Sequence, residues 1–408
     1  MTRKWHGLAL FLFIAITVIT CIDPYSPQLD KFESLLVVDA LLTDENKSNF
    51  VRLSRTFDTL GKEPERISGA LVTIRDDLGN STVLNEGTAG VYRTDSLIFR
   101  GVTGRTYTLH ILTQTGEEYE SDPCKMNPVP EIDSLYYAGD RIMSKETGEN
   151  IEGVRIYIDS NGESATGYFR WTYEEWWKFS VPEVKEYDFI NDSTIPPVAE
   201  VKKICWGNHK SDEIIIGSTI SAATDAIEKK PVHFVASEET DHLLIQYFIE
   251  VRQLSISREE YAFWELMTHL GETGGDIFDH APFQVFSNIK CISNSGEQVV
   301  GYFQVAGARH KSMYITVNDV IDLGLPLYRY KCEMFEKGLI DYPPPIFPGG
   351  GVWWDDIYSG FTNSGYTFIK PTFTQDGELL RLVFVRPFCA DCTLNGSLNK
   401  PDFWVDFE

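Results

Sequence analysis

Short stretches of alternating apolar and polar residues, separated by turn residues, recur along most of this 408-residue chain. Successive side chains of a strand point to opposite faces, so alternation predicts strands with one buried face. Short strands at this spacing are typical of a β-sandwich. Aromatic residues, 13% of the chain, also favour β structure because they pack well on a pleated surface. We expect the first strands at residues 35–42, 50–54, 70–74, 81–84, 90–93 and 107–112.

A Pro-containing break at residues 126–130 divides this pattern, since proline cannot donate to a strand ladder. The fold class we predict is mostly β. An N-terminal immunoglobulin-like or regulatory-like β-sandwich at 35–127 is followed by a larger antiparallel β domain with one capped helix at 131–408. In the second domain we expect strands at residues 151–158, 165–173, 243–251, 301–306, 314–317 and 379–386.

One helix is predicted after residue 256. Ser257 and Glu260 form a capping-box pattern, and an apolar stripe follows up to Gly271, which we expect to end the helix. Just before it, the apolar face of residues 243–256 changes at Arg252 and Gln253, which predicts a β-bulge.

The N-terminus has the pattern of a lipoprotein signal peptide at residues 1–20. Arg3 and Lys4 precede an uncharged run at 7–19, which is too short for a comfortable membrane span. The run ends at Cys21, as in a bacterial lipobox, where the thiol would receive palmitate-type acyl chains. Residues 21–34 would then be a tether. An uncleaved anchor helix, or a secreted protein with a stray cysteine, are the alternatives.

The net charge of −24 makes nucleic-acid binding improbable, because an acidic surface repels phosphate backbones. Six cysteines besides Cys21 suggest disulfides in an exported protein, with fifteen possible pairings. We expect the bridges mainly in the C-terminal domain, where Cys389 and Cys392 either bond to separate partners or tie the tail down, with Cys332 and Cys291 as the favoured mates. Half a zinc site, or free thiols, remain open. The six cysteines are Cys124, Cys205, Cys291, Cys332, Cys389 and Cys392.

Several stretches together resemble one family. They are "CIDPY" with "LLVVDALLTDE", "YFRWTYEE", the segment at 254–289, "VVGYFQVAG" and the ending "CADCTLNGSLNKPDFW". They are similar to a family of Bacteroidota outer-membrane lipoproteins described as domain of unknown function 4249. The resemblance implies a lipid-anchored envelope protein beside a TonB-dependent transporter, with accessory work in uptake or surface assembly. It supplies no catalytic residues. In this phylum, acidic residues just after the lipid cysteine resemble a signal for export to the cell surface. Here only Asp23 follows the cysteine closely, so the sequence does not decide between the cell surface and the periplasmic face.

The sequence lacks a Gly-x-Ser-x-Gly elbow, a Walker loop, a His-Glu-x-x-His helix and a dinucleotide fingerprint. We therefore predict no enzyme, no cofactor and no metal. Histidines such as His233 and His242 are not at metal-ligand spacing. We interpret them as packed or surface residues.

Two aromatic clusters could each form a ligand platform or pack in the hydrophobic core. The first is Trp171, Tyr173, Trp176 and Trp177. The second follows the Pro- and Gly-rich residues 343–351, so we expect it on a loop, where recognition usually occurs. Its carboxylates could also hold Ca²⁺. Core packing, a sugar or siderophore platform and a partner contact are all open. The second cluster is Trp353, Trp354, Asp355, Asp356 and Tyr358.

These features favour a non-enzymatic outer-membrane lipoprotein that captures a ligand for a TonB-dependent transporter in nutrient uptake. Its partners would be membrane lipid, through acylated Cys21, and that transporter. A stand-alone glycan-binding surface lipoprotein is the alternative, and an envelope hydrolase with a scattered catalytic constellation is a lesser one.

Overall fold

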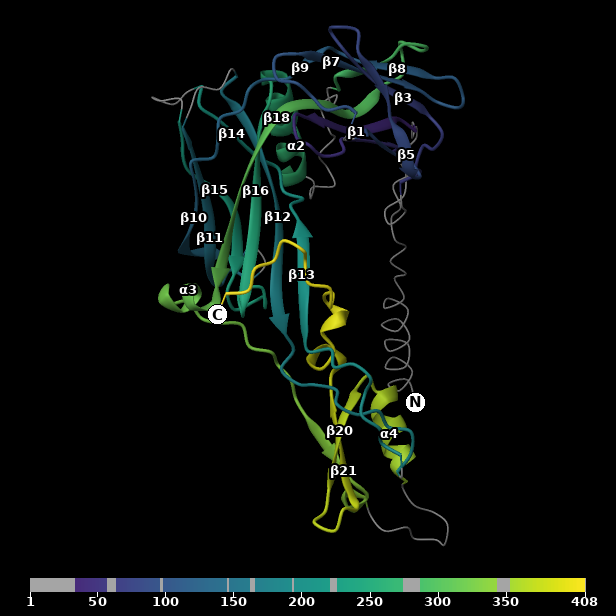
Figure 1. Cartoon of the computed structure of the whole chain (residues 1–408), viewed down its shortest axis with the longest axis vertical. Coiled ribbons are helices and arrows are strands. Elements are labelled where there is room, and N and C mark those ends of the chain that lie inside the picture. Colours follow the sequence, from purple (N-terminus) through teal and green to yellow (C-terminus); the bar gives the residue numbers. More distant parts are fainter. Residues whose placement is uncertain are drawn as a thin grey trace, which may run out of the picture.

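The computed structural model describes residues 34–56, 64–95, 98–144, 147–161, 166–192, 194–220, 226–273, 287–342 and 353–407. The fold is mostly β, as the alternating pattern predicts, and nearly all strand pairs in it are antiparallel. Figure 1 shows an N-terminal sandwich at one end, long strands in the middle and a small α/β tip at the other end.

One long sheet runs through both halves of the chain and positions everything else. Its strands, in spatial order, are β13 (Ile204–Lys210), β12 (Tyr168–Ser180), β16 (Gln246–Ser255), β18 (Val299–Thr316), β1 (Leu36–Thr43), β2 (Phe50–Arg55), β6 (Val91–Arg93) and β5 (Asn85–Thr88), with β14 (Ile215–Ser218) beside β12.

Strand β18 joins the two halves. Its first part pairs in parallel with β1, from Val299 to Ala306, and its second part pairs antiparallel with β16, from Gly307 to Thr316. Gly307 sits at this change, where an added Cβ would lie only 2.7 Å from the Asn127 carbonyl oxygen. The sequence predicts two strands here, whereas the structure has one, because ion pairs hold its polar middle in the sheet.

A second sheet closes the N-terminal sandwich. Its strands are β17 (Ile289–Cys291), β8 (Glu118–Ser121), β7 (Thr106–Leu112), β3 (Leu71–Asp76) and β4 (Ser81–Val83), with β9 (Cys124–Lys125) beside β7. Ile289 and Phe303 pack in the same core as Leu53 and Leu109. The sandwich thus takes strands from both sides of the predicted boundary at 128–130, because β1 and β8 would otherwise present unpaired edges.

A second sandwich forms where one face of the long sheet packs on a three-stranded sheet. That sheet contains β10 (Ser134–Met143), β11 (Asn150–Asn161) and β15 (Ala226–Ala236). Ile156 and Val235 lie in its core together with Trp171, Ile249 and Val251 of the long sheet.

The predicted bulge at Arg252 and Gln253 is wrong. Strand β16 pairs with both neighbours in an unbroken register through these residues. Gln253 is fully buried, and its amide accepts from the Trp171 indole at 2.9 Å and donates to Pro130 O at 3.0 Å. Leu254 and Ile256 are apolar because a helix covers that face of the strand, and the strand itself does not change face.

That helix is α2 (Arg258–Thr273), which confirms the predicted one although it continues past Gly271. Ser257 accepts the Glu260 amide at 3.1 Å, as an N-cap does. Two helices were not expected: α3 (Val317–Asp322) and α4 (Trp354–Asn363). Helix α4 packs on the tip sheet of β19 (Phe335–Lys337), β21 (Leu379–Val385) and β20 (Thr367–Phe373).

Candidate ligand-binding site

The residues of the predicted ligand platform at the tip do not form one surface in the structure. Its residues lie on α4 and not on a loop, because Trp354 and Tyr358 share the helix face that packs into the tip core. Trp353 precedes the helix and is 65% exposed. Asp356 accepts the Trp353 amide at 2.9 Å, and with Asp355 it lies in the first turn, where carboxylates complement the helix dipole. The two tryptophans therefore form no shared stacking face.

The other aromatic cluster belongs to β12 and packs within the protein. Trp171 and Tyr173 are buried in the core of the second sandwich. The ring of Trp177 stacks on His242 with 3.6 Å between centroids, and Trp176 lies on the opposite face, against Phe248. The core-packing interpretation is confirmed for Trp171 and Tyr173.

Two disulfides hold the C-terminal segment. They are Cys205–Cys392 and Cys332–Cys389. Cys389 and Cys392 do bond to separate partners, as expected, and neither is left for a zinc site. Cys332 is one of these partners, as expected, but the expectation for Cys291 is wrong, because its thiol is free and buried in the N-terminal sandwich core. Cys124 is also a free thiol.

Cys21, the signal peptide and most of the tether lie outside the described residues. Within the described ranges, no helix combines the length and apolarity that crossing a bilayer requires.

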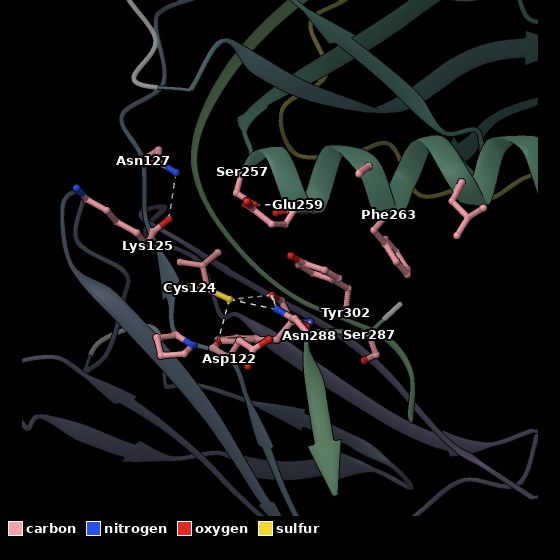
Figure 2. A pocket seen from close by; sticks show the side chains of 16 residues that line it. Asp122, Cys124, Lys125, Asn127, Ser257, Glu259, Phe263, Ser287, Asn288 and Tyr302 are labelled. Carbon is pink, nitrogen blue, oxygen red and sulfur yellow. Dashed lines mark hydrogen bonds between the residues drawn. The ribbon is translucent and has the colours of Figure 1, made fainter. Parts of the chain in front are cut away.

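A partly open cavity of about 550 Å³ lies between α2, the first part of β18 and the segment around β9. Binding pockets for small molecules span roughly 300–1,000 Å³. Phe263 projects from the helix toward Tyr302 of β18, and their rings are 5.1 Å apart (Figure 2). Leu266, Phe303 and Val305 extend this apolar wall. Helix α2 and the N-terminal sandwich therefore meet around a space of ligand size.

Cys124 lies on the wall opposite α2, in a set of hydrogen bonds (Figure 2). Asn288 donates to its sulfur at 3.1 Å and to Phe303 O at 2.9 Å, and the Phe303 amide donates back to Asn288 at 2.9 Å. Burial, and then the charge of Glu260, raises the pKa of the Cys124 thiol to about 12. A thiol of this kind stays protonated near neutral pH and is a poor nucleophile.

Glu260 is the buried carboxyl of the cavity, with only 2% of its surface exposed. Burial raises its pKa to about 7, although Arg170 and a hydrogen bond from Trp264 oppose the change. The Trp264 indole reaches Oε1 at 3.3 Å. Arg170 is held elsewhere, donating to Gln304 at 2.8 Å with its guanidinium 3.9 Å from the Trp264 ring centroid. Among the described residues, Glu260 thus has no cation within ion-pair distance, although the charge of Arg170 acts on it from farther away.

Sequence reasoning identified neither residue as part of a site. It used Cys124 as a disulfide candidate and Glu260 as the second half of a capping box. Ser257 does cap the Glu260 amide, but the carboxyl is buried beside Trp264. A glutamate in the first turn followed four residues later by tryptophan was the only local signal, and on its own it does not separate a cap from a buried carboxyl.

A second polar cluster surrounds Glu175, which is 3% exposed on β12. Its carboxylate lies 3.2 Å from His209 Nδ1 and 3.1 Å from His233 Nε2, and it accepts the Tyr247 hydroxyl at 2.5 Å. Burial raises the pKa of Glu175, but the contacts with His233 and Tyr247 outweigh it, and the pKa falls below its usual value. Among the residues with described placement, no group of three or more His, Cys, Asp or Glu is arranged to hold a metal ion.

The fold and the cavity define a mostly β protein of two linked sandwiches, with a ligand-sized space at their junction. A family model described as Domain of unknown function (DUF4249) matches residues 22–312, and the chain belongs to this family. The matched region contains the whole cavity and ends within β18, so the disulfide-bonded C-terminal segment lies beyond it. Comparison with curated proteins and with solved structures finds no match.

Proposed function

We propose that this protein is a non-enzymatic, lipid-anchored protein of the outer membrane that captures a small molecule for a TonB-dependent transporter. The observation that carries the proposal is the cavity of about 550 Å³ between α2 and β18. Its apolar wall, with polar groups that converge on the same space, is typical of a binding pocket. Cys21 would supply the membrane attachment, with each buried methylene of an acyl chain contributing about 0.8 kcal/mol.

Capture without catalysis agrees with the chemistry of the cavity. Its thiol has a pKa near 12, and the lining residues that the structure describes include no histidine that could act as its base. A cysteine nucleophile needs a lowered pKa or an adjacent base. These features disfavour the envelope hydrolase. The divided tryptophans of α4 give the glycan-binding alternative a single exposed ring, Trp353.

Purification of the tagged, full-length protein in mild detergent tests the proposal. We expect a TonB-dependent transporter to co-purify, and Cys21→Ser to lose its acyl mass, its membrane fractionation and that partner. Recovery of the acylated protein alone under several nutrient conditions would contradict the transporter role.

The cavity itself is tested with Ala262→Trp. Ala262 is exposed on α2 at the cavity, so a large side chain there would block the space without disturbing the core. We expect the variant to remain membrane-bound but to lose uptake of the nutrient. Glu265→Trp is the matched control, since Glu265 is exposed on the same helix but does not line the cavity. Equal uptake by both variants would argue against the cavity.

A further inference from the structure

The acid–base composition of the cavity is one-sided. Its lining includes Asp122, Glu259 and Glu260, but Lys125 is the one basic side chain among the lining residues that the structure describes. Figure 2 shows Lys125 extending away from Cys124 and Tyr302, and this residue is exposed. A negatively charged ligand would therefore meet mainly like charges in the described part of the lining, and like-charge contacts oppose binding.

Glu260 is the most buried of these three acidic residues. It is buried, and Trp264 provides the one hydrogen bond described for its carboxyl group. Arg170 forms no ion pair with it within 4.0 Å among the described residues, being engaged by Gln304 and by the Trp264 ring. A carboxyl that is removed from water without a cationic partner is unfavourable in the free protein. A ligand that brought a cation to it would relieve this cost.

The apolar wall beside Glu260 suits the rest of such a ligand. The rings of Phe263 and Tyr302 are 7% and 8% exposed and lie beside each other at the cavity. Aromatic faces attract ammonium groups and pack against apolar bodies. The hydroxyl of Tyr302, the side chain of Asn288 and that of Ser257 add acceptors around the same space.

From this arrangement we infer that the cavity binds a small amphipathic molecule with a protonated amine, whose ammonium group pairs with Glu260 while its apolar part packs on Phe263 and Tyr302. The inference rests on the proposed capture function and names its ligand class. Binding then brings a cation to ion-pair distance of the carboxyl, in addition to the more distant charge of Arg170, and so favours its charged form.

Calorimetry with three probes of one shape tests the inference on the full chain in detergent: 2-phenylethylamine, 2-phenylethanol and phenylacetate. At pH 7.5 we expect the amine to bind at least tenfold more tightly than the alcohol, and phenylacetate not to bind. Glu260→Gln keeps the size and the Trp264 hydrogen bond but removes the charge, so the preference for the amine should disappear. Glu265→Gln, on the same helix but outside the cavity, should bind like the wild type.

Thermal unfolding provides a second measurement. If Glu260 serves the ligand, Glu260→Gln should leave the Tm of the free protein unchanged or raise it. A lower Tm would assign the carboxyl to the fold and overturn the inference. Equal binding of amine and alcohol, tighter binding of phenylacetate, binding of no probe, or a preference that survives Glu260→Gln would also overturn it. None of these results affects co-purification with the transporter or the loss of uptake with Ala262→Trp, so the proposed function is judged separately.

Discussion

His310 Nε2 lies 2.5 Å from Glu45 Oε1, and this contact ties the middle of β18 to the turn after β1. The same carboxylate also forms an ion pair with Arg252 of β16. On the other side of the ring, His310 Nδ1 is 3.4 Å from Glu250, a distance that suits an ion pair better than a formed hydrogen bond. A histidine between two carboxylates thus links the turn after β1 to β16 and β18 of the long sheet.

This junction should make stability depend on pH. The carboxylates of Glu250 and Glu45 raise the pKa of His310 above 6.5. Burial alone would raise the pKa of Glu45, but His310 and Arg252 lower it to about 2. The histidine contribution is complete below about pH 6.5 and is lost as the pH rises through the folded-state pKa. The Glu45 contribution is complete above about pH 4.5 and is lost toward pH 2.

We therefore expect His310→Gln to lower the free energy of unfolding by about 1–2 kcal/mol at pH 5.5, and by less at pH 8.5. Urea unfolding at the two pH values measures this difference. His110→Gln is the control, because His110 pairs at 2.7 Å with the half-exposed Glu118 within a single sheet. A loss at pH 8.5 as large as that at pH 5.5 would contradict the role of the charged histidine.

The buried Glu175 should be one of the most sensitive positions of the long sheet. Glu175→Gln removes the charge that His209, His233 and Tyr247 contact, and we expect about 3 kcal/mol of destabilisation at pH 7. Since the pKa of Glu175 is lowered in the folded protein, this difference should shrink as the pH falls below about 4.5.

A neighbouring residue offers the control for Glu175. Glu174 lies on the opposite face of β12, with a 38% exposed side chain that pairs with exposed Lys210. Glu174→Gln should change the free energy of unfolding by less than about 0.5 kcal/mol. Equal losses of unfolding free energy for the two substitutions in chemical denaturation would show that the buried cluster stabilises the fold no more than the exposed pair does.

The mostly β fold and α2 were predictable because alternation and a capping pattern are local signals. The union of two expected strands into β18 was not. Arg309 in its polar middle pairs with Asp44 and with Glu131, and these partners are more than a hundred residues away in sequence. Periodicity contains no information about such ion pairs, so a polar stretch that distant partners hold in a sheet resembles a loop.

The tip and the cavity were not predicted from the sequence, for two different reasons. Trp354, Ile357, Tyr358 and Phe361 have helical spacing, so α4 was within reach of periodicity, but the Pro- and Gly-rich run before it favoured a loop. The cavity was beyond reach, since it needs α2, β9 and β18 side by side. No local pattern states which of the polar residues on these three elements face a common space.

The two disulfides should differ in how much they stabilise the fold. Their cysteines are separated by 187 residues in Cys205–Cys392 and by 57 in Cys332–Cys389. Restriction of the unfolded chain grows with loop length, so removing each by paired serine substitutions should cost about 5 and about 4 kcal/mol. Peptide mapping without reductant checks the pairing first. Peptides that join Cys291 to any of these four cysteines would contradict the structure.

Cys124 should be one of the slowest thiols of the protein to react, although it lines an accessible cavity. With a pKa near 12, its thiolate fraction at pH 7.5 is several hundredfold or more below that of an ordinary cysteine, and alkylation by iodoacetamide should slow by about two orders of magnitude or more.

The charge of Glu260 contributes to this high pKa of Cys124. Glu260→Gln should therefore speed alkylation several-fold, while Glu265→Gln should not. Mass spectrometry of the Cys124 peptide follows the rate separately from Cys291, and urea-unfolded protein gives the reference rate. An unchanged rate in Glu260→Gln would mean that burial alone sets the reactivity of Cys124 and that the charge of Glu260 does not affect its pKa.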